Sequence, residues 1–262
     1  MGIKTTVTKK QLPKKYQKYN LIETKDGISD SVYLLDDIYV LKLFENQTEQ
    51  QILSEEILLK DLKDLLVPKV VDILKIEDKY TIIYTQIDGI SIKNTDLDHI
   101  KQIGYFLKEL HNKTYNMNSI NINLFEKERL KELIINSKNK IFLDYFNSIK
   151  IELKNDGLIH GDIFPDNVKF RSNILSGVYD FSEACEGDFL FDLAVVAVSW
   201  CFDKEMLNNS KLDILLNSYG LDIDKVDFIE YMRYAILYYA VTRYINNHNY
   251  KELIEKLEYI LM

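Results

Sequence analysis

The chain has 262 residues, of which 47% are hydrophobic and 12% aromatic, enough for one large domain or two joined lobes with a buried core. This composition disfavours intrinsic disorder as the overall state. With 33 basic and 41 acidic residues the net charge is −8, which disfavours nucleic acid and anionic lipid as partners. No run approaches the roughly 20 apolar residues of a membrane span, and the N-terminal residues lack the apolar core of a signal peptide. We therefore expect a cytoplasmic protein with no membrane partner.

The first third of the chain alternates short apolar runs with polar turns. Three such runs and, after an amphipathic segment, two more are β-branched or aromatic and predict strands. The amphipathic segment has apolar residues at steps of three and four and predicts one helix that ends before Pro68. The predicted strands are Tyr19–Thr24, Ser31–Leu35, Tyr39–Phe44, Val70–Leu74 and Tyr80–Tyr84, and the predicted helix is Thr48–Leu66. This order predicts an N-terminal five-stranded antiparallel sheet with one helix.

The rest of the chain is mainly helical. Helices are expected at Leu97–His111, Leu124–Lys138 and Ile141–Leu153, and over most of the chain from Asp192 onward. We place the domain boundary near residue 88, which gives an N-terminal domain over 1–88 and a C-terminal domain over 89–262.

One segment within the helical part, residues 157–188, combines short strands, turns and clustered carboxylates, a typical setting for chemistry. Four residues separate Asp162 from Asn167, and Asp180 follows after a hairpin built from VKF and GVY. In phosphoryl transfer a carboxylate accepts or orients a hydroxyl proton, while an amide oxygen and a second carboxylate hold magnesium. Asp162, Asn167 and Asp180 supply these three groups. Any one of them alone could be an ordinary cap or turn residue.

The N-terminal part supplies the other groups that such chemistry requires. Lys42 interrupts the apolar third strand, where an inward lysine needs an anionic partner, although a solvent-facing lysine is the alternative. Glu55 and Glu56 on the following helix are both candidate partners, and helical phase does not choose between them. The segment from Gln86 and Ile87 to Gly89 joins the lobes, where its backbone would contact an adenine.

Together these residues resemble the aminoglycoside phosphotransferase and choline kinase superfamily, which shares the protein-kinase fold. The resemblance rests on His160–Asn167, Asp180-Phe181 and Asp192-Leu193-Ala194, and it extends to Lys42, Val67-Pro68 and the helix at Gly104–His111. Within the superfamily, the motifs around Ile163–Val168, Leu175–Phe181 and Trp200-Cys201-Phe202 are most similar to homoserine kinase of this fold. Gly161 departs from that subfamily, which commonly has alanine there, and the chain is shorter than its usual members.

The resemblance implies an α+β, bilobal protein-kinase-like fold that uses ATP and Mg²⁺. It implies that Asp162 is the catalytic base, that Asn167 and Asp180 hold Mg²⁺, and that Lys42, oriented by Glu55, contacts the nucleotide phosphates. The nucleotide loop would be 25–31, with a single glycine, Gly27, and with Ser29 and Ser31 assisting the backbone. Asp192 would cap a helix over Leu193–Val198 or brace the catalytic loop, and His160 would be a structural loop residue.

The acceptor is expected to be a small molecule with a hydroxyl group. Acidic residues outnumber basic ones from Glu183 to the end, which favours a cationic acceptor, although an ordinary acidic surface has the same composition. Glu183 could meet an ammonium group, and Arg243 could bind a carboxylate or form a structural salt bridge. Trp200 would line the acceptor pocket or pack in the core.

The resemblance implies homoserine as the first candidate acceptor, followed by choline or ethanolamine, sugars and aminoglycosides. A nucleotide-binding pseudokinase and a protein kinase are alternatives from other classes; the sequence disfavours both, because the polar groups are all present and Asp-Phe-Gly is replaced by Asp180-Phe181-Ser182. The sequence does not decide between ATP and GTP as the nucleotide, or between a monomer and a homodimer. Cys185 and Cys201 are expected to be reduced thiols in the core.

Overall fold

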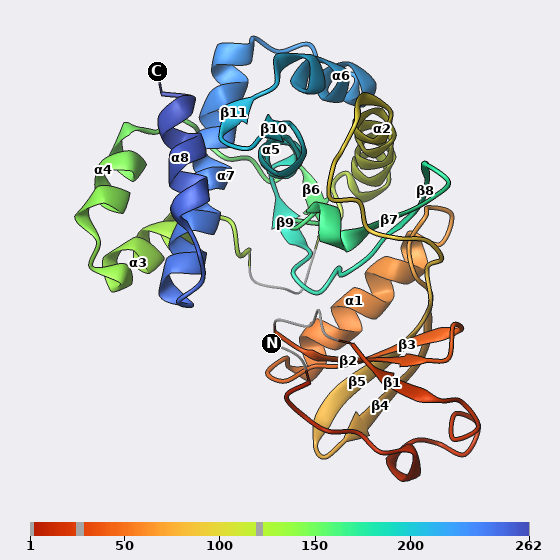
Figure 1. Ribbon diagram of the computed structural model, residues 1–262. Helices are drawn as coiled ribbons and strands as arrows, with labels where there is room; N and C mark the ends of the chain where they lie inside the picture. The colour runs from red at the N-terminus through yellow and green to blue at the C-terminus, as the bar shows by residue number, and fades with distance from the viewer. Residues whose placement is uncertain (1–2, 25–28, 119–122, 262) are drawn as a thin grey trace. The chain divides into compact units, whose positions relative to one another are not determined.

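The computed structural model describes residues 3–24, 29–118 and 123–261 of the chain. By its internal contacts the chain divides into two units, Met1–Asp88 and Gly89–Met262 (Figure 1). No helix in this described part of the chain combines the length and hydropathy that a membrane crossing requires.

As far as its residues are described, the first unit is an antiparallel sheet of five strands with one α-helix. The strand order is β1-β2-β3-β5-β4, and Lys42 on β3 lies opposite Val32 on β2 and Ile82 on β5. The elements are η1 (Lys9–Gln11), β1 (Leu21–Glu23), β2 (Ser31–Leu35), β3 (Tyr39–Leu43), α1 (Glu49–Asp61), β4 (Val70–Ile76) and β5 (Lys79–Thr85). Helix α1 packs against β4 and β5 (Figure 1). The predicted sheet and helix are confirmed.

Helix α1 is shorter than predicted. It begins after Thr48, whose side chain accepts a hydrogen bond from Gln51 N while the Gln51 side chain accepts one from Thr48 N, a capping box. It ends at Asp61, and the Leu65 amide bonds to the Leu62 carbonyl in a turn. The apolar residues beyond Asp61 therefore belong to a turn before Pro68.

In the described residues the second unit is mainly helical, with three small two-stranded sheets. Helix α5 is buried along most of its length and packs against α7, while α2 packs against α6 (Figure 1). Its elements are α2 (Leu97–Thr114), α3 (Lys127–Ser137), α4 (Lys140–Ser148), β6 (Gly157–Ile159), η2 (Pro165–Asn167), β7 (Val168–Arg171), β8 (Ile174–Val178), β9 (Cys185–Gly187), α5 (Phe189–Trp200), β10 (Phe202–Asp203), β11 (Met206–Leu207), α6 (Asn209–Tyr219), α7 (Lys225–Ile245) and α8 (Lys251–Tyr259).

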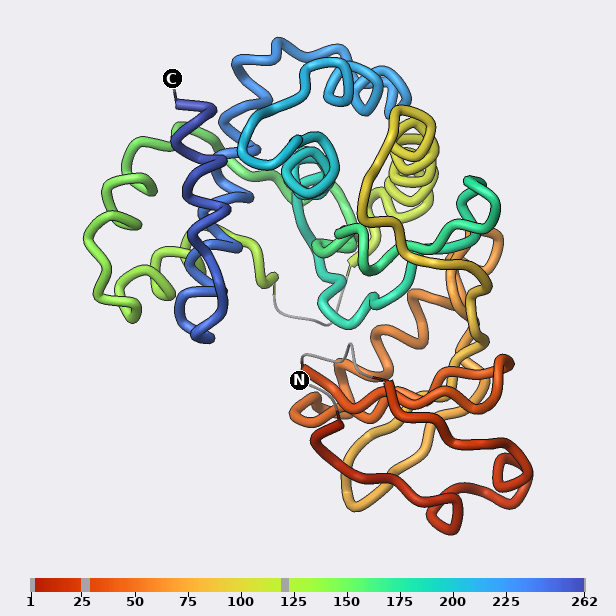
Figure 2. The backbone as a smooth tube through the Cα atoms, in the orientation of Figure 1, coloured from red at the N-terminus to blue at the C-terminus, as the bar shows by residue number. Residues whose placement is uncertain are grey.

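Two antiparallel pairs position the segment that carries the candidate chemistry. Strand β6 pairs with β9, and β7 pairs with β8 as the predicted hairpin. The backbone runs from β6 through a loop into β7, returns along β8 and continues to β9, in the green-to-turquoise part of Figure 2. Asp162 and Asn167 therefore lie in the loop between β6 and β7, and Asp180 lies just after β8.

Candidate active site

The loop that contains Asp162 is fixed by hydrogen bonds to the buried carboxylate of Asp192. Its two oxygens accept hydrogen bonds from the backbone amides of His160 at 2.9 Å and Gly161 at 2.8 Å. His111 Nε2 lies 3.1 Å from the same carboxylate. Burial alone would raise the pKa of Asp192, but these hydrogen bonds and the neighbouring His111 outweigh it and lower the pKa. Asp192 therefore carries its negative charge inside the unit and braces the loop.

The expected helix cap at Asp192 was wrong. Helix α5 begins one turn earlier, at Phe189, and its cap is Asp188, whose Oδ1 accepts a hydrogen bond from Leu190 N at 2.7 Å. Asp192 lies inside the first turn of the helix. A charged residue is tolerated at this buried position because it has three donors around it.

Two aromatic side chains hold carbonyl groups of the same loop. Trp200 Nε1 donates to the Ile163 carbonyl at 2.8 Å, and the Tyr239 hydroxyl on α7 donates to the Gly161 carbonyl. Trp200 is 1% exposed, so the structure places it in the core instead of an acceptor pocket. Its indole acts on the loop by fixing the backbone one residue after Asp162.

His160 is a neutral structural residue of the loop. Its Nδ1 accepts a hydrogen bond from Asp162 N at 3.2 Å, so Nε2 carries the proton and donates to the Tyr179 carbonyl at 3.1 Å. Complete burial lowers the pKa of His160, which agrees with this neutral form. The ring also packs on Phe181, with the ring centres 4.4 Å apart.

Asp162 and Asn167 are in direct contact. The Asn167 amide Nδ2 donates both to the Asp162 carbonyl and to its carboxylate Oδ2, each at 2.8 Å. Burial raises the pKa of Asp162 well above its usual value, and the charges of Glu183, Asp180 and Asp166 raise it further. The carboxylates after β6 and after β8 are thus close enough to repel one another.

The residues around Asp162 supply the donor atoms that a divalent cation prefers. They offer carboxylate and amide oxygens, the ligands that Mg²⁺ prefers, and their mutual repulsion would be relieved by a positive charge. Because Asn167 Nδ2 donates to Asp162, the amide oxygen Oδ1 is the atom with which Asn167 would bind a metal. Asp180 has a left-handed backbone, with φ of 69°, and its Oδ1 accepts a hydrogen bond from Ser182 Oγ at 2.6 Å. No group of three or more His, Cys, Asp or Glu side chains arranged for a metal is present in the described residues.

In the first unit, Lys42 is buried, with 8% exposure, and lies next to a carboxylate. Its ammonium lies 3.4 Å from Asp30 Oδ2. Glu55 is 3% exposed and accepts a hydrogen bond from the Tyr84 hydroxyl at 2.7 Å, whereas Glu56 pairs with Lys60 at 2.7 Å nearer the surface. The structure therefore places Glu55, and not Glu56, on the buried face of α1.

The expected role of Ser31 in nucleotide binding is not supported. Its hydroxyl is buried, accepts hydrogen bonds from the amides of Lys4 and Thr5 at 2.9 Å each, and donates to Glu45 Oε1 at 2.6 Å. Each hydrogen-bonding position of the hydroxyl is thus used within the unit. Ser29 is exposed, and its carbonyl accepts a hydrogen bond from Lys4 Nζ at 2.9 Å. The rest of the expected nucleotide loop, 25–28 with Gly27, lies outside the described residues.

The segment after β5 ends the first unit. Gln86 N donates to the Ile38 carbonyl at 3.0 Å, and the buried side-chain oxygen Oε1 of Gln86 has no hydrogen-bond partner in the described residues. Ile87 follows it and is half-buried. Contact of this segment with an adenine stays a prediction.

The two charged residues proposed for the acceptor both lie near the Asp162 loop. Glu183 is exposed, and its charge contributes to the raised pKa of Asp162. The Arg243 guanidinium on α7 lies 5.9 Å from the ring centre of Phe164, a residue of the loop. One helical turn earlier, the ring of Tyr239 packs edge-on against Phe164, with the ring centres 4.9 Å apart.

Sequence reasoning did not single out Asp30 or Tyr239. Asp30 follows the polar KDGIS stretch and has the appearance of a turn residue, so its contact with Lys42 could not be read from the pattern. Tyr239 lies in an apolar helix rich in tyrosine, where the helical period gives the face of a residue but not its distant carbonyl partner.

The family and the fold follow from comparison with known proteins. The model of the phosphotransferase enzyme family matches residues 21–220. The chain is 29% identical over 182 residues to a homoserine kinase of Bartonella tribocorum, covering 62% of this chain and 56% of that protein. It is 26% identical over 234 residues to a homoserine kinase of Methylocella silvestris, covering 78% of this chain and 73% of that protein. The chain thus spans little more than half the length of the Bartonella relative.

Among solved structures, the ternary complex of streptomycin, ATP and aminoglycoside phosphotransferase APH(2″)-IIa is similar, with a TM-score of 0.62 and 20% identity. The similarity covers 94% of this chain and 93% of that one. This similarity confirms the expected α+β, protein-kinase-like fold. Because the family model covers most of the chain, from β1 to the end of α6, the protein belongs to the phosphotransferase enzyme family.

Proposed function

We propose that this protein is an ATP- and Mg²⁺-dependent kinase that transfers the γ-phosphoryl group to the hydroxyl of a small metabolite, with homoserine as the first candidate. The observation that carries the proposal is the contact between Asp162 and Asn167, which fixes a carboxylate and an amide oxygen in one braced loop. Membership of the phosphotransferase family supports the same chemistry.

Asp162 would act on the acceptor hydroxyl. Oδ2 of the Asp162 carboxylate accepts a hydrogen bond from Asn167, so we assign Oδ1 of Asp162 as the oxygen that accepts the hydroxyl proton. Asn167 Oδ1 and Asp180 would hold Mg²⁺, which when bound would neutralise charge on the phosphates. The hydrogen bonds from Trp200 and Tyr239 keep the loop carbonyls in place, so Asp162 does not have to be reoriented during the reaction.

Lys42 would bind the nucleotide phosphates, with Glu55 orienting it. This assignment is supported by the burial of both side chains and by the resemblance of the Lys42 strand and the Glu55 helix to the kinase pattern. A buried ammonium without bound anion needs acidic neighbours, and Asp30 is one of them. ATP as the nucleotide is supported by the similar APH(2″)-IIa, whose structure contains ATP.

Homoserine is favoured because two relatives are homoserine kinases and because the loop has charged residues of both signs near it. Glu183 would meet the ammonium group of the amino acid, and Arg243 its carboxylate. Arg243 lies beside Phe164, only two residues from Asp162 in the chain, which supports a role close to the acceptor.

The proposal is tested by ADP release from Mg·ATP with a panel of acceptors: homoserine, choline, ethanolamine, simple sugars and aminoglycosides. Turnover stimulated by homoserine supports the proposal. Preference for another acceptor would support the kinase activity and contradict homoserine as the acceptor. ATP binding with no turnover on the panel or on protein substrates would favour a pseudokinase. Phosphorylation of protein substrates alone would favour a protein kinase.

The carboxylate assignment has a sharper test in 3-aminopropanol, which is homoserine without its carboxylate. Replacing Arg243 with glutamine should raise KM for homoserine at least about tenfold, since a charge-assisted pair is lost, and leave 3-aminopropanol unchanged. The matched control is Arg129→Gln, an exposed arginine on α3 that should affect neither acceptor. An equal change for both acceptors would mean that Arg243 has only a structural role.

A further inference from the structure

Asp30 is a buried carboxylate of the first unit that no step of the proposed transfer uses. It is 7% exposed and precedes strand β2. Its Oδ2 lies 3.4 Å from the Lys42 ammonium, and its Oδ1 accepts a hydrogen bond from the backbone amide of Glu45 at 3.1 Å. Each carboxylate oxygen therefore has its own partner, one fixed in the backbone and one at the end of a long side chain.

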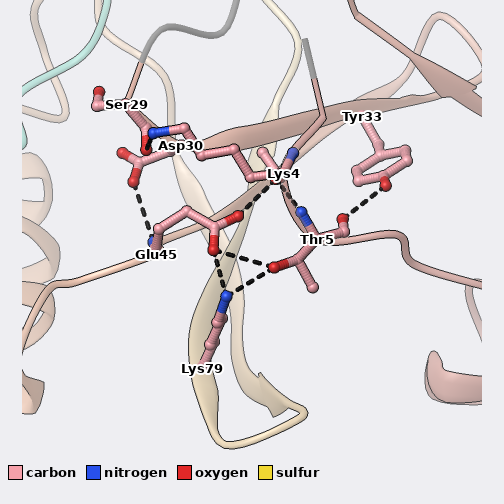
Figure 3. Close-up of polar contacts among 8 residues, drawn as sticks. Lys4, Thr5, Ser29, Asp30, Tyr33, Glu45 and Lys79 are labelled. Atoms are coloured by element: carbon pink, nitrogen blue, oxygen red, sulfur yellow. Dashed lines mark hydrogen bonds and ion pairs between the residues drawn. The ribbon is translucent and has the colours of Figure 1, made fainter. Parts of the chain in front are cut away.

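The backbone that holds Asp30 is itself anchored by a polar network (Figure 3). The Glu45 carboxylate accepts hydrogen bonds from Ser31 Oγ at 2.6 Å, from Thr5 Oγ1 at 3.0 Å and from the Lys79 ammonium. Lys79 also donates to Thr5 Oγ1 at 2.7 Å. The N-terminal segment, the start of β2, the end of β3 and the start of β5 are thus joined around Glu45. Asp30 is consequently held in one position.

Lys42 is the movable partner of the pair. Its separation from Asp30, 3.4 Å, is longer than the roughly 2.7–2.9 Å of a close charge-assisted hydrogen bond. The ammonium also lies 4.8 Å from the ring centre of Phe44, a weak interaction. A lysine side chain is a flexible chain of four carbons, so the ammonium can turn toward a new anion while the carboxylate stays in place.

We propose that Asp30 is a positioning residue that holds the Lys42 ammonium in the nucleotide-free protein and competes with the nucleotide phosphates for it. The inference rests on the proposed function, because Lys42 is assigned to the phosphates there. A fixed carboxylate close to incoming phosphate repels it, and this repulsion weakens nucleotide binding. Asp30 thus sets the nucleotide affinity below the value that Lys42 alone would give, and it keeps the ammonium paired between turnovers.

The test is ADP binding by calorimetry to the unmodified protein and to Asp30→Asn. The asparagine oxygen can still accept the Glu45 amide, so the variant removes the charge and keeps the anchor. We expect ADP to bind at least about fivefold more tightly, and KM for ATP to fall with kcat unchanged. Asp37→Asn is the matched control, because Asp37 is an exposed aspartate in the β2–β3 turn with the same charge change. Asp30→Ser, which also retains an acceptor, replaces Asp30→Asn if that variant fails to fold.

The outcomes separate the inference from the proposed function. Equal ADP affinity in the unmodified protein and in Asp30→Asn, or a fall in kcat, overturns the competition and leaves the kinase proposal standing. If the unmodified protein binds no nucleotide, both fail. The pair itself has an independent readout in the acetylation of Lys42 by acetic anhydride, followed by mass spectrometry without nucleotide. Asp30→Asn should be labelled faster, because an ammonium with one fewer negative charge beside it gives up its proton more readily. Equal labelling would overturn the pairing.

Discussion

Replacing Asp192 with alanine would leave three buried donors without their acceptor. The carboxylate accepts the amides of His160 and Gly161 and is paired with His111, all inside the second unit. Hydrogen bonds to a charged group contribute roughly 1.5–3 kcal/mol each, and breaking a buried ionic network typically costs about 3–5 kcal/mol. We take about 3–5 kcal/mol as the expected loss in the free energy of unfolding, since the individual terms are not additive.

Urea unfolding followed by tryptophan fluorescence measures this loss of unfolding free energy in the second unit of the chain. The chain has one tryptophan, Trp200, at the end of the same helix as Asp192, so its emission reports the unfolding of the second unit. Asp227→Ala is the control, because Asp227 is an exposed acid in the first turn of α7 and should cost less than about 1 kcal/mol. A loss for Asp192→Ala no larger than the control would refute the bracing role.

The same pair of proteins gives a pH test. The folded-state pKa of Asp192 is lowered because its hydrogen bonds outweigh the effect of burial, so its contribution to stability is complete above the ordinary aspartate value of about 3.9. The contribution is lost as the pH falls through the lower, folded-state pKa. The stability that the Asp192 charge contributes, measured against Asp192→Ala, should therefore decrease as the pH falls below about pH 4.

Three further predictions concern the same unit. Asp162→Asn should lower turnover about 10²–10⁴-fold while the melting temperature stays equal or rises, because burial and neighbouring carboxylates make the charge unfavourable; a lower melting temperature would contradict this account. Gly161→Ala should lower the free energy of unfolding in urea by at least about 2 kcal/mol, since φ is +78° and the new Cβ would lie 2.3 Å from the Phe125 ring. Adding Phe125→Leu to this variant should recover part of the lost stability. Cys185, whose pKa burial raises to about 12, and Cys201, whose pKa burial also raises, should react with Ellman's reagent only after unfolding; reaction of the folded protein would place a thiol outside the core.

The elements and several motif residues could be predicted because they depend on local patterns. Strand β2, Ser31–Leu35, agrees with its prediction at both ends, since alternating buried side chains and polar turns define it. The short spacing between Asp162 and Asn167 placed both in one loop, and the structure adds their direct contact. The burial of Lys42 followed from its place in an apolar strand.

The remaining features depend on contacts between distant parts of the chain. Ser31 looked like a phosphate-binding hydroxyl, but the segment at Thr5, 26 residues earlier, folds back onto it. The start of α5 was misplaced because an aspartate in an apolar run is an obvious helix cap. Only the positions of His111 and of the loop amides show why Asp192 can lie inside the helix. Such pairings have no periodic signal in a single sequence.

The groups that hold the Asp162 loop bind its main chain. Asp192 meets two amides, and Trp200 and Tyr239 meet two carbonyls, all from outside the loop. The shape of the loop is therefore specified elsewhere, in α5 and α7, through bonds to the main chain of the loop. A substitution in the loop that leaves these main-chain bonds in place would therefore change the side chains around Asp162 without changing the backbone that carries it.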